Sequence, residues 1–246
     1  MGNVTFRDIG EALDRSYVSE FIWIDPDAFD DDATYLLSII LKLKMRGFDV
    51  AINPIHARGT LYENMLFFSG SKKIIGGTGD LPGHSKFHDK DYDQLIPTPH
   101  HSQFEFFRNR AFFASLTGKE DHTAFALPFN KSPHIDSSRI NVVICPGAGG
   151  VTRQWPPSSF ASLIGIMEKN NPGAFQFIIA GGPGDDRLAA EIKASVNFPL
   201  LDLAGKTSLI ELIDLIGNCQ LLISNESSPV HMAAATGVPA ICISNG

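Results

Sequence analysis

Ile140-Asn-Val-Val-Ile-Cys145 is an apolar, β-branched run, and the small residues Pro146-Gly-Ala-Gly-Gly150 follow it at once. Valine and isoleucine favour extended backbone. Such a run, bounded by glycine and proline, predicts a buried strand that ends in a tight turn. A helix is predicted next, over 158–170, so the order is strand, glycine-rich turn, helix. Parallel α/β sheets are built by repeating this order.

The same alternation of strand and helix continues through the second half of the chain. Each predicted strand is a short apolar run, and each predicted helix repeats its apolar residues at helical spacing. We therefore predict a doubly wound α/β domain with a parallel sheet over 140–246. Its further strands are predicted at 175–180, 200–203, 221–224 and 240–244, and its further helices at 185–195, 208–216 and 229–236.

The first half shows the pattern more loosely. Residues 76–99 are rich in Gly, Pro, His and Asp, which predicts one long loop. We assign 1–128 to a partial N-terminal domain, 129–139 to a linker and 140–246 to a C-terminal domain. Strands are predicted at 21–25, 48–53 and 73–75, and helices at 33–46, 60–69 and 102–116. The phenylalanines around the last helix are expected to lie mostly in the core: Phe104, Phe106, Phe107, Phe112 and Phe113.

The composition argues against several classes of protein. Apolar residues make up 43% of the 246 residues and charged residues 19%, which is typical of a globular chain. The net charge of −7 disfavours binding by neutralisation of nucleic-acid phosphates. No apolar run reaches the roughly 20 residues of a membrane-spanning helix, and the first residues do not read as a signal peptide. We expect a cytoplasmic protein whose cysteines, Cys145, Cys219 and Cys242, are reduced and buried.

Three turns follow the predicted carboxyl ends of strands, where open α/β sheets bind their ligands. They are 146–150 with Arg153 behind it, 181–184, and 224–228 with His231 behind it. Small residues expose backbone N–H groups that suit phosphate, and an arginine adds a charged fork. A carboxylate beside hydroxyls, as in Glu226-Ser-Ser228, suits a ribose diol and a phosphate. Each turn taken alone is equally an ordinary strand-to-helix connection, with Glu226 as a helix cap and His231 as a packing residue.

The sequence also contains partial matches to simpler phosphate-, dinucleotide- and metal-binding motifs, but each lacks a required feature. Ala204-Gly-Lys-Thr-Ser208 ends like a phosphate-binding P-loop, but Leu200 stands where the first glycine is required. The first turn fails the dinucleotide fingerprint because Thr152 replaces its last glycine. A calcium loop starting at Asp89 lacks its glycine and its glutamate. His84 and His88 have the spacing of helical metal ligands, but their glycine- and proline-rich surroundings favour solvated loop histidines.

Four segments follow one another across the second half: Pro146-Gly-Ala-Gly-Gly-Val-Thr-Arg-Gln-Trp-Pro-Pro157, Gly181-Gly-Pro-Gly-Asp185, Leu203-Ala-Gly-Lys-Thr-Ser-Leu209 and Ser224-Asn-Glu-Ser-Ser-Pro-Val-His-Met-Ala-Ala-Ala235. In order and spacing this half resembles glycosyltransferase family 9, the ADP-heptose:lipopolysaccharide heptosyltransferase group. The first half matches more loosely. The resemblance implies a GT-B-like fold, in which two Rossmann-like α/β domains with parallel sheets face a cleft. It also implies that the chain lacks the family's N-terminal and C-terminal ends, so that its N-terminal domain is incomplete.

The resemblance implies an activity as well. It is the inverting, metal-independent transfer of a sugar, expected to be heptose, from a nucleotide-diphosphate donor to a lipopolysaccharide or related glycan. No cofactor, metal or nucleic-acid partner is expected. Peripheral contact with the inner membrane surface is expected. The donor-binding residues that it implies are Gly147, Ala148, Gly149, Arg153, Gly181, Gly182, Gly184, Thr207, Glu226, Ser227, Ser228 and His231.

Three features depart from the family pattern. Arg153 stands where lysine is usual, and Ser228 stands where the family has a glycine close to phosphate. The family's first strand and Gly-Asp turn, whose aspartate is the proposed general base, have no match in 1–17. No catalytic residue is therefore assigned. Two alternatives stay open: a non-catalytic α/β nucleotide-binding module, and another nucleotide-sugar enzyme of the same fold, such as an epimerase.

Overall fold

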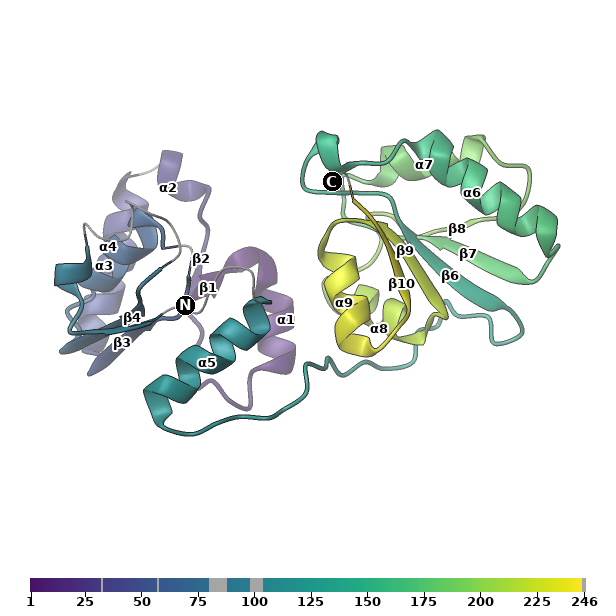
Figure 1. Ribbon diagram of the computed structural model, residues 1–246. Helices are drawn as coiled ribbons and strands as arrows, with labels where there is room; N and C mark the ends of the chain where they lie inside the picture. The colour runs from purple at the N-terminus through teal and green to yellow at the C-terminus, as the bar shows by residue number, and fades with distance from the viewer. Residues whose placement is uncertain (32, 57, 80–87, 98–103, 245–246) are drawn as a thin grey trace. The chain divides into compact units, whose positions relative to one another are not determined.

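The computed structural model describes residues 1–31, 33–56, 58–79, 88–97 and 104–244 (Figure 1). The chain forms two compact units. Unit 1 consists of residues 1–7 and 15–124, and unit 2 of residues 8–14 and 125–246. Within the described residues, none of the helices combines the length and the apolar composition needed to cross a bilayer.

Unit 2 is built on a five-stranded parallel sheet whose strand order is β10-β9-β6-β7-β8. The chain starts in the middle at β6, moves outward through β7 to β8, and then returns to the other side of β6 for β9 and β10. Val143 of β6 is accordingly in register with Ile178 of β7 on one side and Leu222 of β9 on the other. The strands are β6 (Ile140–Cys145), β7 (Phe175–Ile179), β8 (Leu201–Asp202), β9 (Leu221–Asn225) and β10 (Ala240–Ile243).

Helices cover both faces of this sheet, and alternation along β6 builds both cores. Val143 and Cys145 point to one cluster with Leu212 and Ala233, whereas Val142 and Ile144 point to the other. Successive side chains of a strand face opposite sides, so a strand buried on both faces is apolar throughout. This explains the uninterrupted Val-Val-Ile-Cys run. The helices are α6 (Pro157–Asn170), α7 (Asp186–Ala194), α8 (Leu209–Asn218) and α9 (Ser228–Thr236).

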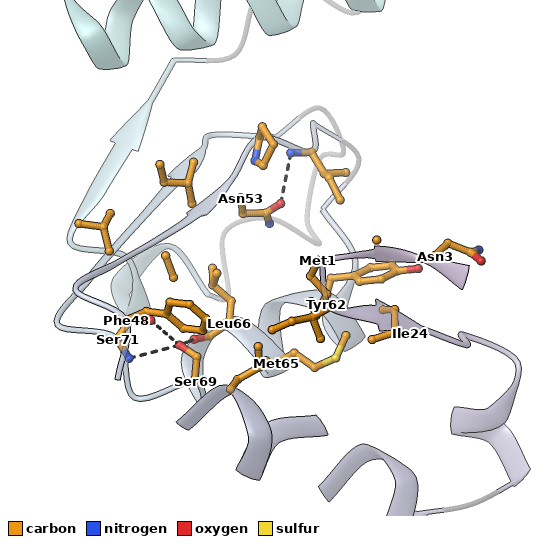
Figure 2. Close-up of a pocket in the computed structure, with 18 residues that line it drawn as sticks. Met1, Asn3, Ile24, Phe48, Asn53, Tyr62, Met65, Leu66, Ser69 and Ser71 are labelled. Carbon is orange, nitrogen blue, oxygen red and sulfur yellow. Dashed lines mark hydrogen bonds between the residues drawn. The ribbon is translucent and has the colours of Figure 1, made fainter. Parts of the chain in front are cut away.

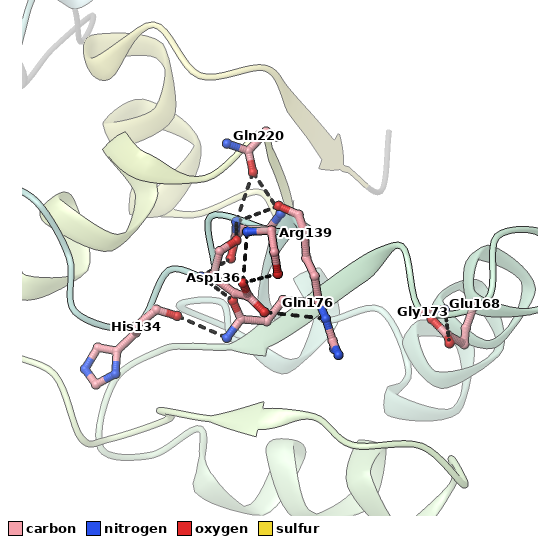
Figure 3. Close-up of polar contacts among 9 residues, drawn as sticks. His134, Asp136, Arg139, Glu168, Gly173, Gln176 and Gln220 are labelled. Atoms are coloured by element: carbon pink, nitrogen blue, oxygen red, sulfur yellow. Dashed lines mark hydrogen bonds and ion pairs between the residues drawn. The ribbon is translucent and has the colours of Figure 1, made fainter.

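A polar cluster at the amino end of the sheet attaches the incoming chain to unit 2 (Figure 3). The buried Asn141 side chain accepts from Asp136 N–H at 3.0 Å and donates to the Asp136 carbonyl at 2.9 Å. Gln220 accepts from Asn141 N–H at 2.8 Å, and Gln176 accepts from Asp136 N–H at 2.8 Å. Residues 125–139 thus lie against unit 2, and a separate linker over 129–139 stays a prediction.

Unit 1 contains two separate parallel ladders. One is a sheet of order β3-β4-β5, and the other joins the two-residue strands β1 and β2. An apolar cluster packs beneath them, with Ile24, Leu43 and Met65 at its centre. The strands are β1 (Gly2–Asn3), β2 (Trp23–Ile24), β3 (Val50–Asn53), β4 (Lys73–Gly77) and β5 (Gln94–Ile96); the helices are α2 (Ala28–Asp31), α3 (Ala33–Arg46), α4 (Thr60–Phe67) and α5 (Glu105–Thr117).

Short segments complete the elements: α1 (Arg7–Leu13), the 3₁₀ turns η1 (Val4–Phe6), η2 (Asp89–Asp91) and η3 (Val151–Arg153). Most of α1 belongs to unit 2, where Ile9 packs against the core.

A buried charge network holds the loops at the carboxyl end of β3 and β4. Arg58 donates to Glu63 and to Asp89, each at 2.6 Å, and Tyr92 O–H donates to Glu63 at 2.9 Å. Burial raises the pKa of Tyr92 to about 12, so its hydroxyl stays protonated. The ring of Tyr92 lies so close to Gly76 that a Cβ there would overlap it. Only a glycine therefore fits at this point of β4.

Four sequence predictions are wrong in detail. Residues 76–99 are not one loop, because the short strand β5 pairs with β4; three residues are too few to show a period. No strand was predicted before residue 21, but the two-residue β1 pairs with β2. Cys242 is exposed, since β10 is an edge strand. Of the five phenylalanines, Phe112 is fully buried, whereas the side chains of three are 44–53% exposed: Phe104, Phe107 and Phe113.

Candidate functional site

A cavity of about 240 Å³ opens at the carboxyl end of the unit 2 sheet. It lies beside the boundary between β6 and β9, where the chain reverses its direction across the sheet. Loops that leave two such strands diverge toward opposite faces, so a crevice forms between them without any further device. The cavity is lined by Cys145, Gly147, Ala148, Gly149, Gly181, Gly182, Asp185, Leu209, Leu212, Ser227, Ser228, Pro229 and Met232.

Asp185 links two of the loops. Its carboxylate accepts a hydrogen bond from Gly182 N–H at 2.8 Å. A Cβ at Gly147 or at Gly181 would overlap the same carboxylate, so a larger residue at either position would displace it. Burial raises the pKa of Asp185, the nearby Asp186 raises it further, and the Gly182 N–H opposes the shift. The result is a partly buried carboxylate that faces the cavity with acceptor capacity left over.

Asn225 joins the third loop to the first. Its side chain is fully buried at the end of β9. Its amide donates to the Pro146 carbonyl at 2.6 Å, and its carbonyl accepts from Trp155 N–H at 3.0 Å. The glycine-rich turn after β6 is therefore held at both of its ends by one residue from the neighbouring strand.

The start of α9 supplies another part of the wall. Ser227 is its N-cap residue; the Ser227 hydroxyl donates to the Asn225 carbonyl at 3.2 Å and accepts no hydrogen bond from a helix N–H. Pro229 has no N–H and Val230 N–H donates to the Ser227 carbonyl, so this end offers the Ser228 backbone and the partial positive charge of a helix N-terminus. Together with the glycine turn, this end of the cavity suits an anion.

The remaining wall is apolar. Leu209 and Leu212 of α8 and Met232 of α9 contribute it. Cys145 lies at the bottom, where burial raises the pKa of its thiol far above the usual range, so the thiol is protonated and inert as a nucleophile. An apolar wall facing an anion-binding end is the arrangement that a nucleotide needs, because its base is flat and its phosphates are charged.

The cavity gathers seven of the twelve predicted donor-binding residues: Gly147, Ala148, Gly149, Gly181, Gly182, Ser227 and Ser228. Arg153 lies on η3, beside the cavity. Its guanidinium packs against Gly149: a Cβ added to this glycine would lie 2.9 Å from Nη2 of Arg153. Gly184, Thr207, Glu226 and His231 do not line it. Glu226 is exposed and accepts from the Ser244 hydroxyl at 3.2 Å. The Thr207 hydroxyl is buried and has no hydrogen-bond partner among the described residues.

Sequence reasoning missed two polar residues here. Asp185 falls in one of the quoted segments, but the sequence analysis assigns it no role. The signal for Asp185 in the sequence is the pair of glycines at 147 and 181, because glycine is favoured where a side chain packs closely against the backbone. Asn225 stands next to Glu226 and was passed over in its favour. His84 lies outside the described residues; His88 bonds with Asp91 at 3.1 Å.

Comparison with known proteins places the chain in a family. The family model described as glycosyltransferase family 9 (heptosyltransferase) matches residues 37–243. Lipooligosaccharide heptosyltransferase 2 of Haemophilus influenzae is 31% identical over 120 residues, which are 47% of this chain and 34% of that relative. The chain thus matches about a third of the length of this relative.

Solved structures show the same fold across nearly the whole chain. A family 9 glycosyl transferase from Veillonella parvula has a TM-score of 0.79 at 14% identity, over 98% of this chain and 70% of that one. The Escherichia coli heptosyltransferase WaaC, solved with ADP-2-deoxy-2-fluoro heptose, has a TM-score of 0.66 at 14% identity, over 97% and 82%. The predicted GT-B-like α/β class is thereby confirmed at the level of fold. With a family model matched over residues 37–243, the chain belongs to glycosyltransferase family 9.

Proposed function

We propose that unit 2 binds the nucleotide-sugar donor of an inverting heptosyltransferase, with an ADP-type nucleotide in the cavity at the end of β6 and β9. One observation carries this proposal: three turns from separate parts of the chain converge on one cavity that has an anion-binding end and an apolar end. The relative WaaC was solved with an ADP-sugar analogue, which supports the choice of nucleotide.

Each wall has a separate task in this proposal. The diphosphate lies against the 147–149 turn and the start of α9, where backbone N–H groups and the helix dipole offset its charge. Arg153, one turn away, adds a full positive charge. Asp185 accepts hydrogen bonds from the hydroxyls of the ribose. The base packs on Leu209 and Met232.

The same groups account for the chemistry of transfer. As the sugar leaves, negative charge develops on the diphosphate, and preorganised N–H groups with Arg153 stabilise it more than they stabilise the ground state. An acceptor hydroxyl attacks from the opposite face of the sugar and needs a base to take its proton. We assign no residue of this chain to that base. The acceptor, a lipopolysaccharide core or related glycan, and peripheral association with the inner membrane belong to the same proposal and rest on the family.

Calorimetric titration of the chain with ADP tests the donor site. We expect saturable binding that Arg153→Ala weakens at least tenfold. Arg187→Ala is the matched control, because Arg187 is an exposed arginine of the same unit that pairs with Glu191 on α7; it should leave the Kd unchanged. A sample that melts cooperatively but does not bind ADP would overturn the proposal, as would equal effects of the two substitutions.

A further inference from the structure

Helix α3 of unit 1 is apolar on two opposite faces. Its inner face includes Ile39 and Leu43, which are buried in the core of this unit. Ile24 and Met65 belong to the same apolar cluster, and Figure 2 shows both beside the cavity of unit 1. One turn of a helix takes 3.6 residues, so successive side chains are about 100° apart around its axis. This spacing places a second set of apolar side chains on the side turned away from the core.

The outward side of α3 carries three large apolar side chains in one row. Leu37, Leu41 and Met45 are spaced four residues apart and so lie on successive turns of the helix. They are 59%, 58% and 81% exposed, respectively. A single exposed leucine is common on a protein surface, but a surface helix normally turns its apolar stripe toward the core and its polar residues toward water. A row of three therefore indicates a face that meets an apolar environment.

Lysines flank this row. By the same helical spacing, Lys42 lies on one side of the row and Lys44 on the other, and both are exposed. The stem of Lys44 packs along Gly70, where an added Cβ would lie 3.2 Å from Cγ of the lysine. The sequence of α3 contains no Asp or Glu, and the charge of Arg46 is offset by Glu20 at 2.6 Å. We call the row and its two lysines the outer face of α3; it is apolar in the middle and positive at its sides.

We infer that the outer face of α3 is the surface by which unit 1 lies on a membrane that contains anionic lipids. A helix that lies in the plane of such a membrane buries its apolar side chains at the boundary between headgroups and acyl chains, and its basic residues are attracted to the anionic headgroups. The lysine stems lie along the apolar region while their ammonium groups stay in water. This inference rests on the peripheral membrane association in the proposed function, and it adds the surface and the charge of the lipid.

A second copy of the chain fits this face less well than a membrane does. In a two-fold contact the same surface of both copies meets itself, so the lysines of one copy would lie against those of the other. The helix α3 offers no carboxylate to offset that repulsion. Anionic phospholipids supply negative charge in their headgroups and an apolar environment in their acyl chains. A membrane therefore satisfies both parts of the outer face of α3.

Co-sedimentation with phospholipid vesicles, carried out on the whole chain, tests this inference. We expect saturable binding to vesicles of equal parts phosphatidylglycerol and phosphatidylcholine, and binding at least tenfold weaker to phosphatidylcholine alone. Leu41→Glu and Met45→Glu should each weaken binding to the mixed vesicles at least tenfold, because a carboxylate replaces an inserted apolar side chain. Lys42→Glu should weaken this binding at least fivefold, because it reverses a charge beside anionic headgroups.

Helix α6 of unit 2 supplies the matched controls. Ile166 of this helix is 58% exposed, and Lys169 is exposed in its last turn. Ile166→Glu and Lys169→Glu make the same changes of charge as the variants of α3 do. Both should leave binding to the mixed vesicles within twofold of the parent protein.

Three results would overturn the inference. The first is no binding to mixed vesicles by a chain that melts cooperatively, and the second is an equal loss of binding in Leu41→Glu and Ile166→Glu. The third is a dimer in sedimentation equilibrium that Leu41→Glu dissociates while the parent does not bind vesicles, which would assign the outer face of α3 to a second copy. Titration with ADP keeps the donor site separate, because Leu41→Glu should bind ADP with the Kd of the parent. A chain that binds vesicles through α3 but does not bind ADP would overturn the donor site and leave the outer face of α3 supported.

Discussion

Substitution of Asp185 by asparagine should separate ligand binding from stability. Asparagine has the same shape and still accepts from Gly182 N–H, but it carries no charge. If the carboxylate holds the ribose hydroxyls, the variant loses charge-assisted hydrogen bonds, which contribute about 1.5–3 kcal/mol each. Loss of one such bond corresponds to roughly a 10- to 100-fold weaker Kd for ADP.

The stability of the protein should change in the opposite direction. Since the pKa of Asp185 is raised in the folded state, mainly by burial, the folded protein keeps a proton that the unfolded chain has already released. The free energy of unfolding therefore falls as the pH rises from the ordinary aspartate pKa through the raised one, and the loss is complete above it. Asp185→Asn removes this loss, so at neutral pH the variant should unfold at higher urea concentration than the parent protein.

Two measurements check the reasoning. Calorimetric titration with ADP gives the Kd, and urea unfolding at several pH values gives the stability. Asp186→Asn is the matched control, because Asp186 is an exposed aspartate at the next position on α7; its Kd should stay within about twofold of the parent. An Asp185→Asn variant that binds ADP as tightly as Asp186→Asn does would refute the proposed role of Asp185.

Three further substitutions test the geometry. Gly147→Ala should weaken ADP binding at least tenfold in the same titration because its methyl group overlaps Asp185, whereas Gly184→Ala, which meets no atom within 4 Å, should not change the Kd. Asn225→Ala should lower the free energy of unfolding by about 1–3 kcal/mol for each of the two backbone groups it leaves unpaired and weaken ADP binding as well; unchanged urea unfolding would contradict the clamp. Arg58→Ala should lower the free energy of unfolding by about 3–5 kcal/mol because Glu63 stays buried without its charge partner. A circular-dichroism unfolding curve that matches that of Arg187→Ala would contradict this prediction.

The second half of the fold could be predicted from the sequence because its signals are local. The run at 142–145 is apolar at every position, as a strand buried on both faces must be, and every later strand of the sheet was predicted to within two residues. In unit 1 the strands are two to five residues long. Gln94-Leu-Ile96 has no period to read, and its pairing with β4 depends on contacts made by Asp93 with Ile74, which are remote in sequence.

The candidate site likewise has a part that could be predicted from local sequence and a part that could not. Its backbone part could be predicted, since glycine at the end of a strand is visible in a single sequence. The side chains could not be ranked, because a carboxylate before a helix is equally a cap or a ligand until its neighbours are known. Glu226 and Asp185 illustrate this: both are acidic residues between a strand and a helix, yet the structure puts Asp185 against the cavity and Glu226 beside Ser244 at the exposed surface.

The contrast between Asp185 and Asn225 shows how the cavity is kept in shape. Asn225 satisfies two backbone groups that would otherwise be buried without partners, so its contacts stabilise the fold whether or not a ligand is present. Asp185 is held in a place where burial disfavours its charge, and the fold tolerates this only because the Gly182 N–H offsets part of the cost. A residue that costs stability and faces a cavity points to a ligand, and a neutral isostere that stabilises the protein while weakening ADP binding is the result that this argument requires.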